Sequence, residues 1–162
     1  MVLVAEQKVI KLEFETGSYS HTLKHSVLYS VKRNKFVKGF CHKGTRWRCE
    51  YRVFPGVYIV WSVSGFKDSR GLVFTIRKVK VGEDGSMSNV EIMFNDSLLL
   101  DDLLKMRDDP NAPGSLRLFI NSIPIAYHTV GSIPSSDVTF DADEVQRVIT
   151  YVTTYLIKTA ED

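Results

Sequence analysis

Two kinds of β-strand follow one another in residues 46–63, which read RWRCEYRVFPGVYIVWSV. In residues 47–53 apolar and charged side chains alternate, and this period of two indicates a strand with one face buried and the other in water. Pro55-Gly56 then interrupts the pattern. Residues 57–63 are almost continuously apolar and β-branched or aromatic, which is typical of a strand covered on both faces. The stretch therefore predicts the centre of a β-sheet.

Alternating patterns of the same kind continue on both sides of this stretch. The triplet Arg33-Asn34-Lys35 is typical of a turn, so a return strand is expected from Phe36. The turn formers of residues 82–85 predict a hairpin. The predicted strands are residues 10–15, 27–31, the return from Phe36, 47–53, 57–63, 72–81, 88–94, 116–120 and 125–130.

Two helices are predicted from capping residues and spacing. Residues 95–97, Asn-Asp-Ser, offer N-caps to a short helix over 98–106. Near the C-terminus Asp141 is an N-cap candidate, and Glu144 three residues later completes a near capping box. The apolar side chains that follow recur at helical spacing and form one face, which we expect to be buried. These residues are Val145, Val148, Ile149, Val152 and Leu156, in a helix expected within 141–160.

The length of 162 residues suits one domain with a hydrophobic core, so residues 1–162 are treated as a single β-rich domain. Roughly seven to nine strands with one or two helices predict an α+β fold. Its expected form is an antiparallel β-sandwich or rolled sheet with a C-terminal amphipathic helix and one short internal helix.

The predicted compartment is intracellular, in the cytoplasm or the nucleus. No stretch approaches the ~20 apolar residues that span a bilayer, so no transmembrane segment is expected. Residues 1–8 lack the basic flank of a secretory signal peptide. In a reducing compartment Cys41 and Cys49 are interpreted as free thiols. A cross-strand bridge is the alternative, because the turn-like Lys43-Gly44-Thr45 lies midway between them.

Charge is distributed unevenly along the chain, although the net formal charge is only +2. Residues 21–55 hold nine basic residues and one acidic residue, a formal charge of +8. In contrast, residues 82–114 carry −6 and residues 137–162 carry −4. A basic patch of this density attracts phosphates, in nucleic acid or in acidic lipid head groups. The alternative is a solvated strand face that keeps the sheet soluble.

The candidate binding site follows from strand periodicity. Arg46, Arg48 and Arg52 share one face of the predicted strand, because strand side chains repeat every two residues. The preceding hairpin adds further cations if consecutive strands are neighbours. Aromatic residues such as Trp47 and Tyr51 are interpreted as core, with base stacking as the alternative. The predicted nucleic-acid or anionic-lipid site comprises Lys32, Arg33, Lys35, Lys38, Lys43, Arg46, Arg48 and Arg52.

Common catalytic and metal-binding motifs are absent from the sequence. It contains no glycine-rich nucleotide loop, no Gly-x-Ser-x-Gly elbow and no His-Glu-x-x-His. His21, His25 and His42 with the two cysteines offer zinc-ligating atoms, but their spacing matches no common zinc module. We therefore predict no catalytic residue, no metal and no cofactor. An enzyme with an unrecognised site is the alternative.

Two segments carry a resemblance to a known family. Residues 12–17, LEFETG, followed by residues 26–33, SVLYSVKR, resemble the opening of bornavirus-type matrix proteins of negative-strand RNA viruses. Chain length, the predicted sandwich and the C-terminal helix are also similar to that group. The resemblance implies a viral structural protein that self-assembles into homo-oligomers, at the inner face of a membrane or in a virion, and contacts RNA or lipid through basic residues.

The expected function is that of a non-enzymatic structural or assembly protein. Its basic strand face would bind nucleic acid, RNA above all, or an anionic membrane, and a viral matrix-like role is its most concrete form. The alternative is an intracellular protein–protein interaction module that binds neither. Salt-dependent binding distinguishes the two, because counterions are released when cations meet phosphates.

Overall fold

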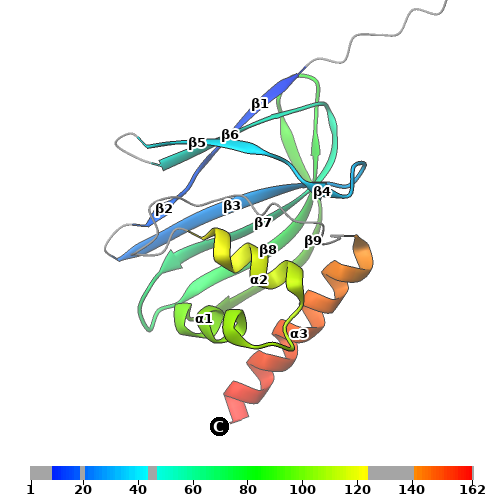
Figure 1. Ribbon diagram of the computed structural model, residues 1–162. Coiled ribbons are helices and arrows are strands. Elements are labelled where there is room, and N and C mark those ends of the chain that lie inside the picture. The colour runs from blue at the N-terminus through cyan, green and yellow to red at the C-terminus, as the bar shows by residue number, and fades with distance from the viewer. Residues whose placement is uncertain (1–8, 19–20, 44–46, 124–140, 162) are drawn as a thin grey trace, which may run out of the picture.

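Two antiparallel sheets and three helices make up the computed structural model, which describes residues 9–18, 21–43, 47–123 and 141–161 (Figure 1). The small sheet has the order β1-β6-β5, and the larger has the order β2-β3-β7-β8-β9, with β4 paired to β3. The strands of the small sheet are β1 (Ile10–Glu15), β6 (Trp47–Val53) and β5 (Gly39–Lys43). The larger sheet consists of β2 (Gly17–Ser18), β3 (Thr22–Ser30), β4 (Lys35–Phe36), β7 (Gly56–Phe66), β8 (Leu72–Val81) and β9 (Met87–Leu98). The helices are α1 (Leu100–Asp108), α2 (Gly114–Ser122) and α3 (Ala142–Glu161).

The predicted α+β, β-rich fold is confirmed, and the alternating strands explain its layers. The apolar residues of β1 and of the part of β6 after Arg48 point to one side, where they pack on one end of the larger sheet. Tyr51 is fully buried there, and its hydroxyl donates a hydrogen bond to the carbonyl oxygen of Ser26 over 3.2 Å. The residues of this first core are Ile10, Leu12, Leu28, Cys49, Tyr51, Val53, Tyr58, Val60, Val79 and Val81.

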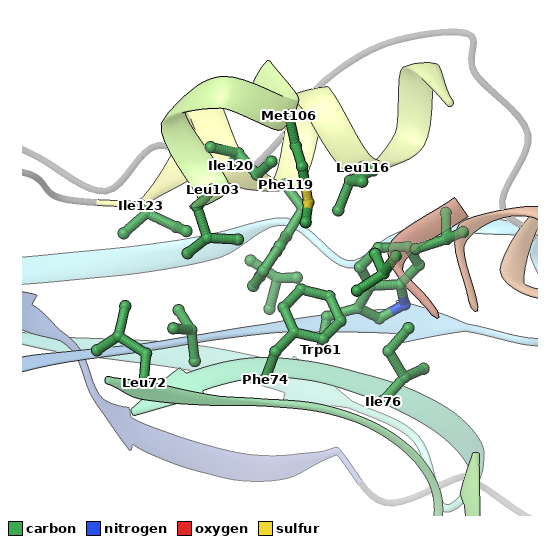
Figure 2. Packing of buried hydrophobic residues seen from close by; sticks show 14 of the residues in the cluster. Trp61, Leu72, Phe74, Ile76, Leu103, Met106, Leu116, Phe119, Ile120 and Ile123 are labelled. Carbon is green, nitrogen blue, oxygen red and sulfur yellow. The ribbon is translucent and has the colours of Figure 1, made fainter. Parts of the chain in front are cut away.

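A second core lies between the opposite face of the larger sheet and the helices. Figure 2 shows Met106, Leu116 and Phe119 pointing from α1 and α2 towards Trp61 and Phe74 on the sheet. The ring centroid of Phe119 lies 5.5 Å from that of Phe74 and 5.6 Å from that of Trp61. Because β7 is flanked by both cores, residues 58–61 are buried on both faces, as the sequence predicts, whereas Val57 at the start of the predicted run is exposed.

Helix α2 corrects one prediction, because residues 116–120 were expected to form a strand. Leu116, Phe119 and Ile120 are buried at the i, i+3, i+4 spacing of one helical face, whereas Leu118 is only partly buried. The alternation of three apolar residues fits a period of two as well as a period of 3.6 over so short a window. The predicted partner strand at 125–130 lies outside the described residues.

Helix α1 begins later than predicted. Residues 95–97 continue β9 instead of capping the helix, and α1 starts at Leu100. The cap is supplied from inside the helix: the backbone N–H of Leu99 donates to Asp102 Oδ2 over 2.9 Å. The prediction rested on a capping side chain that precedes the helix, whereas here the capping carboxylate belongs to the first turn of the helix itself.

Helix α3 confirms the predicted cap and the predicted apolar face. The carboxylate of Asp141 accepts a 2.9 Å hydrogen bond from the backbone N–H of Glu144. Val145, Val148 and Val152 are buried against the second core, and Ile149 packs beside them while partly exposed. None of the described helices is long and apolar enough to cross a membrane.

Cys41 and Cys49 form a disulfide, so their interpretation as free thiols is wrong. The two residues are direct partners in the antiparallel pairing of β5 with β6. Directly opposed residues bring their side chains to within bonding reach, which is the cross-strand alternative. The compartment was the only ground for preferring thiols, and the register of the two strands outweighs it.

Candidate phosphate-binding site

The outer face of the small sheet carries part of the predicted basic surface, but it also carries acids. Arg48 and Arg52 are exposed there, and each lies two positions from Glu50, on either side of it. Strand β1 pairs with β6 so that Glu15 lies opposite Arg48. Glu13 and Lys11 of β1 also face outwards, and an Oε atom of Glu50 lies 3.1 Å from Nε of Arg52. This face is therefore of mixed charge.

The acids on this face are Glu50 of β6 and Glu13 and Glu15 of β1, and the two from β1 lie outside the basic segment 21–55. Glu50 also lies 3.9 Å from Lys11 Nζ and 3.9 Å from His42 Nε2, so it has Lys11, Arg52 and an imidazole as neighbours. The acidic stretches 82–114 and 137–162 lie elsewhere in the sequence and were not expected to cancel the patch locally. The pairing of β1 with β6 joins segments that are over thirty residues apart in the sequence, since Ile10 is the direct partner of Val53.

The remaining predicted cations have separate positions. Arg46 and the side chain of Lys43 lie outside the described residues. Lys35 lies in β4 and Lys38 follows it, and both side chains are exposed. Lys32 and Arg33 occupy the turn between β3 and β4, and these two come together with Arg52 at one end of the first core.

This meeting point is a pocket of about 460 Å³. One wall is the β3–β4 turn and the other is the segment that connects β6 to β7. Both ends of the pocket therefore belong to tight turns, whose positions the two sheets fix. The lining residues are Ser30, Val31, Lys32, Arg33, Val37, Arg52, Val53, Phe54, Pro55, Gly56, Val57 and Tyr58.

Local hydrogen bonds hold the cationic turn in place. The backbone N–H of Asn34 donates to the carbonyl oxygen of Ser30 over 2.9 Å, and that of Arg33 donates to Ser30 Oγ over 3.2 Å. Asn34 has a positive φ of 55°, a conformation that asparagine tolerates better than most residues. The hydroxyl of Tyr29 donates to Asn34 Oδ1. The turn thereby presents Lys32 and Arg33 in a defined position.

The opposite wall is fixed by Tyr58. Its hydroxyl donates a 2.7 Å hydrogen bond to the carbonyl oxygen of Phe54, which closes the connection between β6 and β7. Burial raises the pKa of Tyr58, while the positive charge of Arg33 acts in the opposite direction. Tyr58 therefore stays a neutral hydrogen-bonding phenol at physiological pH. The effect of Arg33 on its pKa means that the guanidinium lies near the phenol ring.

The charge of the pocket is positive. Among the described residues that line it, three are cations and none is a carboxylate. Within the part of the chain that the structure describes, neither Lys32 nor Arg33 forms an ion pair, whereas Arg52 pairs with Glu50. Arginine and lysine in this arrangement bind a phosphate by charge-assisted hydrogen bonds. The volume falls within the range of small-ligand sites, roughly 300–1,000 Å³.

The sequence predicted the three cations of the pocket but not its walls. Tyr58 was assigned to the core strand over 57–63, Phe54 lay between the two predicted strands, and neither was a candidate. Pro55-Gly56 was recognised as a break between strands, and that break is the signal that could have pointed to a recessed surface beside the strand ends.

His25, a zinc candidate in the sequence, has a different environment. It is 1% exposed, with Nδ1 2.5 Å from Thr16 Oγ1 and Nε2 3.0 Å from Ser122 Oγ. Burial lowers its pKa to about 3, so its imidazole is neutral. The histidine packs in the helical core near Phe119, while the cysteines are joined in the small sheet on the other side.

The fold and the pocket define a β-rich α+β protein with two antiparallel sheets and a cationic recess at one end. The chain matches no model of a known protein family. It is 26% identical over 145 residues to protein ORF157 of Acidianus filamentous virus 1 (isolate United States/Yellowstone). The matched region covers 90% of this chain and 91% of ORF157.

Solved structures show the same fold. The structure of ORF157 matches with a TM-score of 0.78 at 24% identity and covers 91% of this chain and 99% of that one. A crystal structure of an engineered protein matches with a TM-score of 0.76 at 21% identity, over 92% and 98% of the two chains. The similarity to a viral protein supports a viral origin. It corrects the resemblance to bornavirus-type matrix proteins, which this relative is not.

Proposed function

We propose that the protein binds single-stranded nucleic acid, with RNA as the first candidate, by seating a phosphate in the pocket of Lys32, Arg33 and Arg52. The observation that carries the proposal is that three cations meet around a recess, with no carboxylate among the lining residues that the structure describes. Phosphate contacts supply most of the affinity of such complexes and are independent of sequence.

The walls of the pocket favour a single strand over a duplex. Phe54 and Pro55 are partly exposed beside the cations, and Val57 is 38% exposed. An unpaired base can lie against such an apolar wall, whereas a stacked base in a duplex cannot reach into a recess. The ligand class is therefore a sugar–phosphate chain with unstacked bases.

The surroundings of the pocket disfavour the anionic membrane that the sequence left open. Glu83 and Asp84, both exposed, lie on an adjoining depression that shares Pro55 and Gly56 with the pocket. A flat anionic surface would have to approach these carboxylates as well as the cations, at a cost in repulsion. A flexible strand can contact the cations and avoid the acids.

The experiment compares wild type with the triple variant Lys32→Ala, Arg33→Ala, Arg52→Ala by fluorescence anisotropy with a labelled oligouridine. About three phosphate contacts predict that log affinity falls against log salt with a slope near −2, from about 0.7 counterions per contact. The triple variant should lose most of the affinity. A matched control, Arg70→Ala, Lys105→Ala, Arg107→Ala, removes three charges from other parts of the surface and should bind as wild type does.

Three outcomes would overturn the proposal: a folded triple variant that binds like wild type, a control that loses as much affinity, or a wild type without affinity at low salt. Binding to acidic vesicles is measured in parallel. If wild type binds the vesicles but not oligouridine, and the triple variant loses the vesicle binding, the pocket is assigned to a membrane. Binding without chemistry is part of the proposal, so the oligouridine should be recovered intact. Shortened products would give the pocket a catalytic role. Self-assembly stays a prediction.

A further inference from the structure

We infer that the bound strand leaves the pocket across Val57 and places its next phosphate on Lys80. This inference rests on the proposed function and names the second contact of the same site. It gives the strand a direction, from the β3–β4 turn towards the tip of the β8–β9 hairpin.

The register of the larger sheet aligns the two positions. Val57 and Lys80 are direct partners in the pairing of β7 with β8, so their side chains point to the same side. Neighbouring strands lie about 4.8 Å apart, and the flexible four-carbon stem of lysine extends its ammonium group beyond that distance. A nucleic-acid strand that passes over Val57 therefore comes within reach of the Lys80 ammonium group.

The surface between the two cationic positions is apolar and exposed. Val31 is 43% exposed and Val57 38% exposed, and both line the pocket. Beyond Pro55 and Gly56 the pocket adjoins a second depression of about 590 Å³, on which Lys80 lies. The two hollows share these two residues and therefore adjoin one another between Arg33 and Lys80.

Lys80 has a positive charge that is available to a ligand. Its side chain is exposed, and no ion pair is formed by it among the residues that the structure describes. Glu83 and Asp84 line the same depression, but the Asp84 carboxylate accepts the backbone N–H of Ser86 over 3.0 Å within its own turn. These two acids repel any phosphate beyond Lys80, so the site ends there.

The test is the variant Lys80→Gln, measured with uridine 5′-monophosphate and with an eight-residue oligouridine. The mononucleotide fills only the pocket, so its affinity should stay within about twofold. The oligouridine should bind several-fold more weakly, and its salt slope should become shallower by about 0.7. Lys78→Gln is the matched control, because Lys78 lies on the same strand opposite Glu91 and off the proposed path.

The outcomes separate this inference from the proposed function. If wild type binds neither ligand, the proposed function fails. If the pocket triple variant loses both ligands while Lys80→Gln binds both as wild type does, only the path to Lys80 is wrong. Equal loss of both ligands in Lys80→Gln would place Lys80 in the pocket and also overturn the path. The double variant Glu83→Gln, Asp84→Asn should tighten oligouridine binding, and an unchanged affinity would refute the acidic boundary.

Discussion

Truncating Phe119 to alanine removes the ring at which the helices meet the larger sheet. Phe119 is 0% exposed, and the rings of Phe74 and Trp61 lie 5.5 Å and 5.6 Å from it. A buried Phe→Ala change costs about 3–5 kcal/mol in transfer energy and cavity formation. Phe74 packs edge-to-face on Phe119 with an interplanar angle of 86°, and such a pair is worth roughly 0.5–1.5 kcal/mol beyond area burial. We expect the free energy of unfolding to fall by the upper part of that range, about 4–5 kcal/mol.

Leu118 provides the comparison within the same segment. A strand over 116–120 would direct Leu118 to the core and Phe119 away from it, whereas helix α2 does the reverse. Leu118→Ala should therefore cost only about 1–2 kcal/mol, as a partly buried position does.

Urea unfolding followed by tryptophan fluorescence measures both changes at a common slope. A loss below about 1.5 kcal/mol for Phe119→Ala would refute the helical packing, since a buried Phe→Ala change exceeds that value. A greater loss for Leu118→Ala than for Phe119→Ala would do so as well.

The disulfide and the buried histidine give the other predictions. Cys41 and Cys49 are eight residues apart, and a closed loop of that size stabilises the fold by about 2.5 kcal/mol in the chain-entropy treatment; the double change to serine should lower the melting temperature, and an equal value would contradict a formed bridge. The pKa of His25 is lowered from 6.5 to about 3, so between these pH values the imidazole is protonated in the unfolded chain and neutral in the folded chain. The contribution of neutral His25 to the free energy of unfolding is complete above pH 6.5 and decreases towards pH 3, by about 2 kcal/mol between pH 6.5 and 5. Unfolding of wild type and His25→Gln at both pH values checks this, and parallel pH profiles would show that His25 is not the cause.

Strands with one buried face could be predicted from the sequence because burial imposes the pattern directly. In β1 and β6 every second residue contacts the first core, and in β7 the near-continuous apolar run reflects two covering layers. Residues 116–120 lack such a constraint, since Leu116 and Ile120 satisfy both periods. The deciding residue is Phe119: a strand with Leu116 and Ile120 buried would expose its side chain to solvent, whereas helix α2 buries it.

The candidate site was only partly predictable for a related reason. Lys32, Arg33 and Arg52 stand out by charge, and charge can be read residue by residue. Their neighbours depend on pairings between distant segments. Glu15 lies beside Arg48 only because β1 joins β6, and Tyr58 forms a pocket wall only because its hydroxyl closes the turn at Phe54.

Strand β7 belongs to both hydrophobic cores at once. Ile59, Trp61 and Val63 face the helices, while Tyr58 and Val60 face the small sheet. Neither half can be excised as an autonomous fragment, because either cut leaves one side of this strand open to water. Folding is therefore expected to be a single cooperative transition. A defect in either layer is transmitted to the other through one backbone, so the mutational tolerance of β7 should be the lowest in the chain.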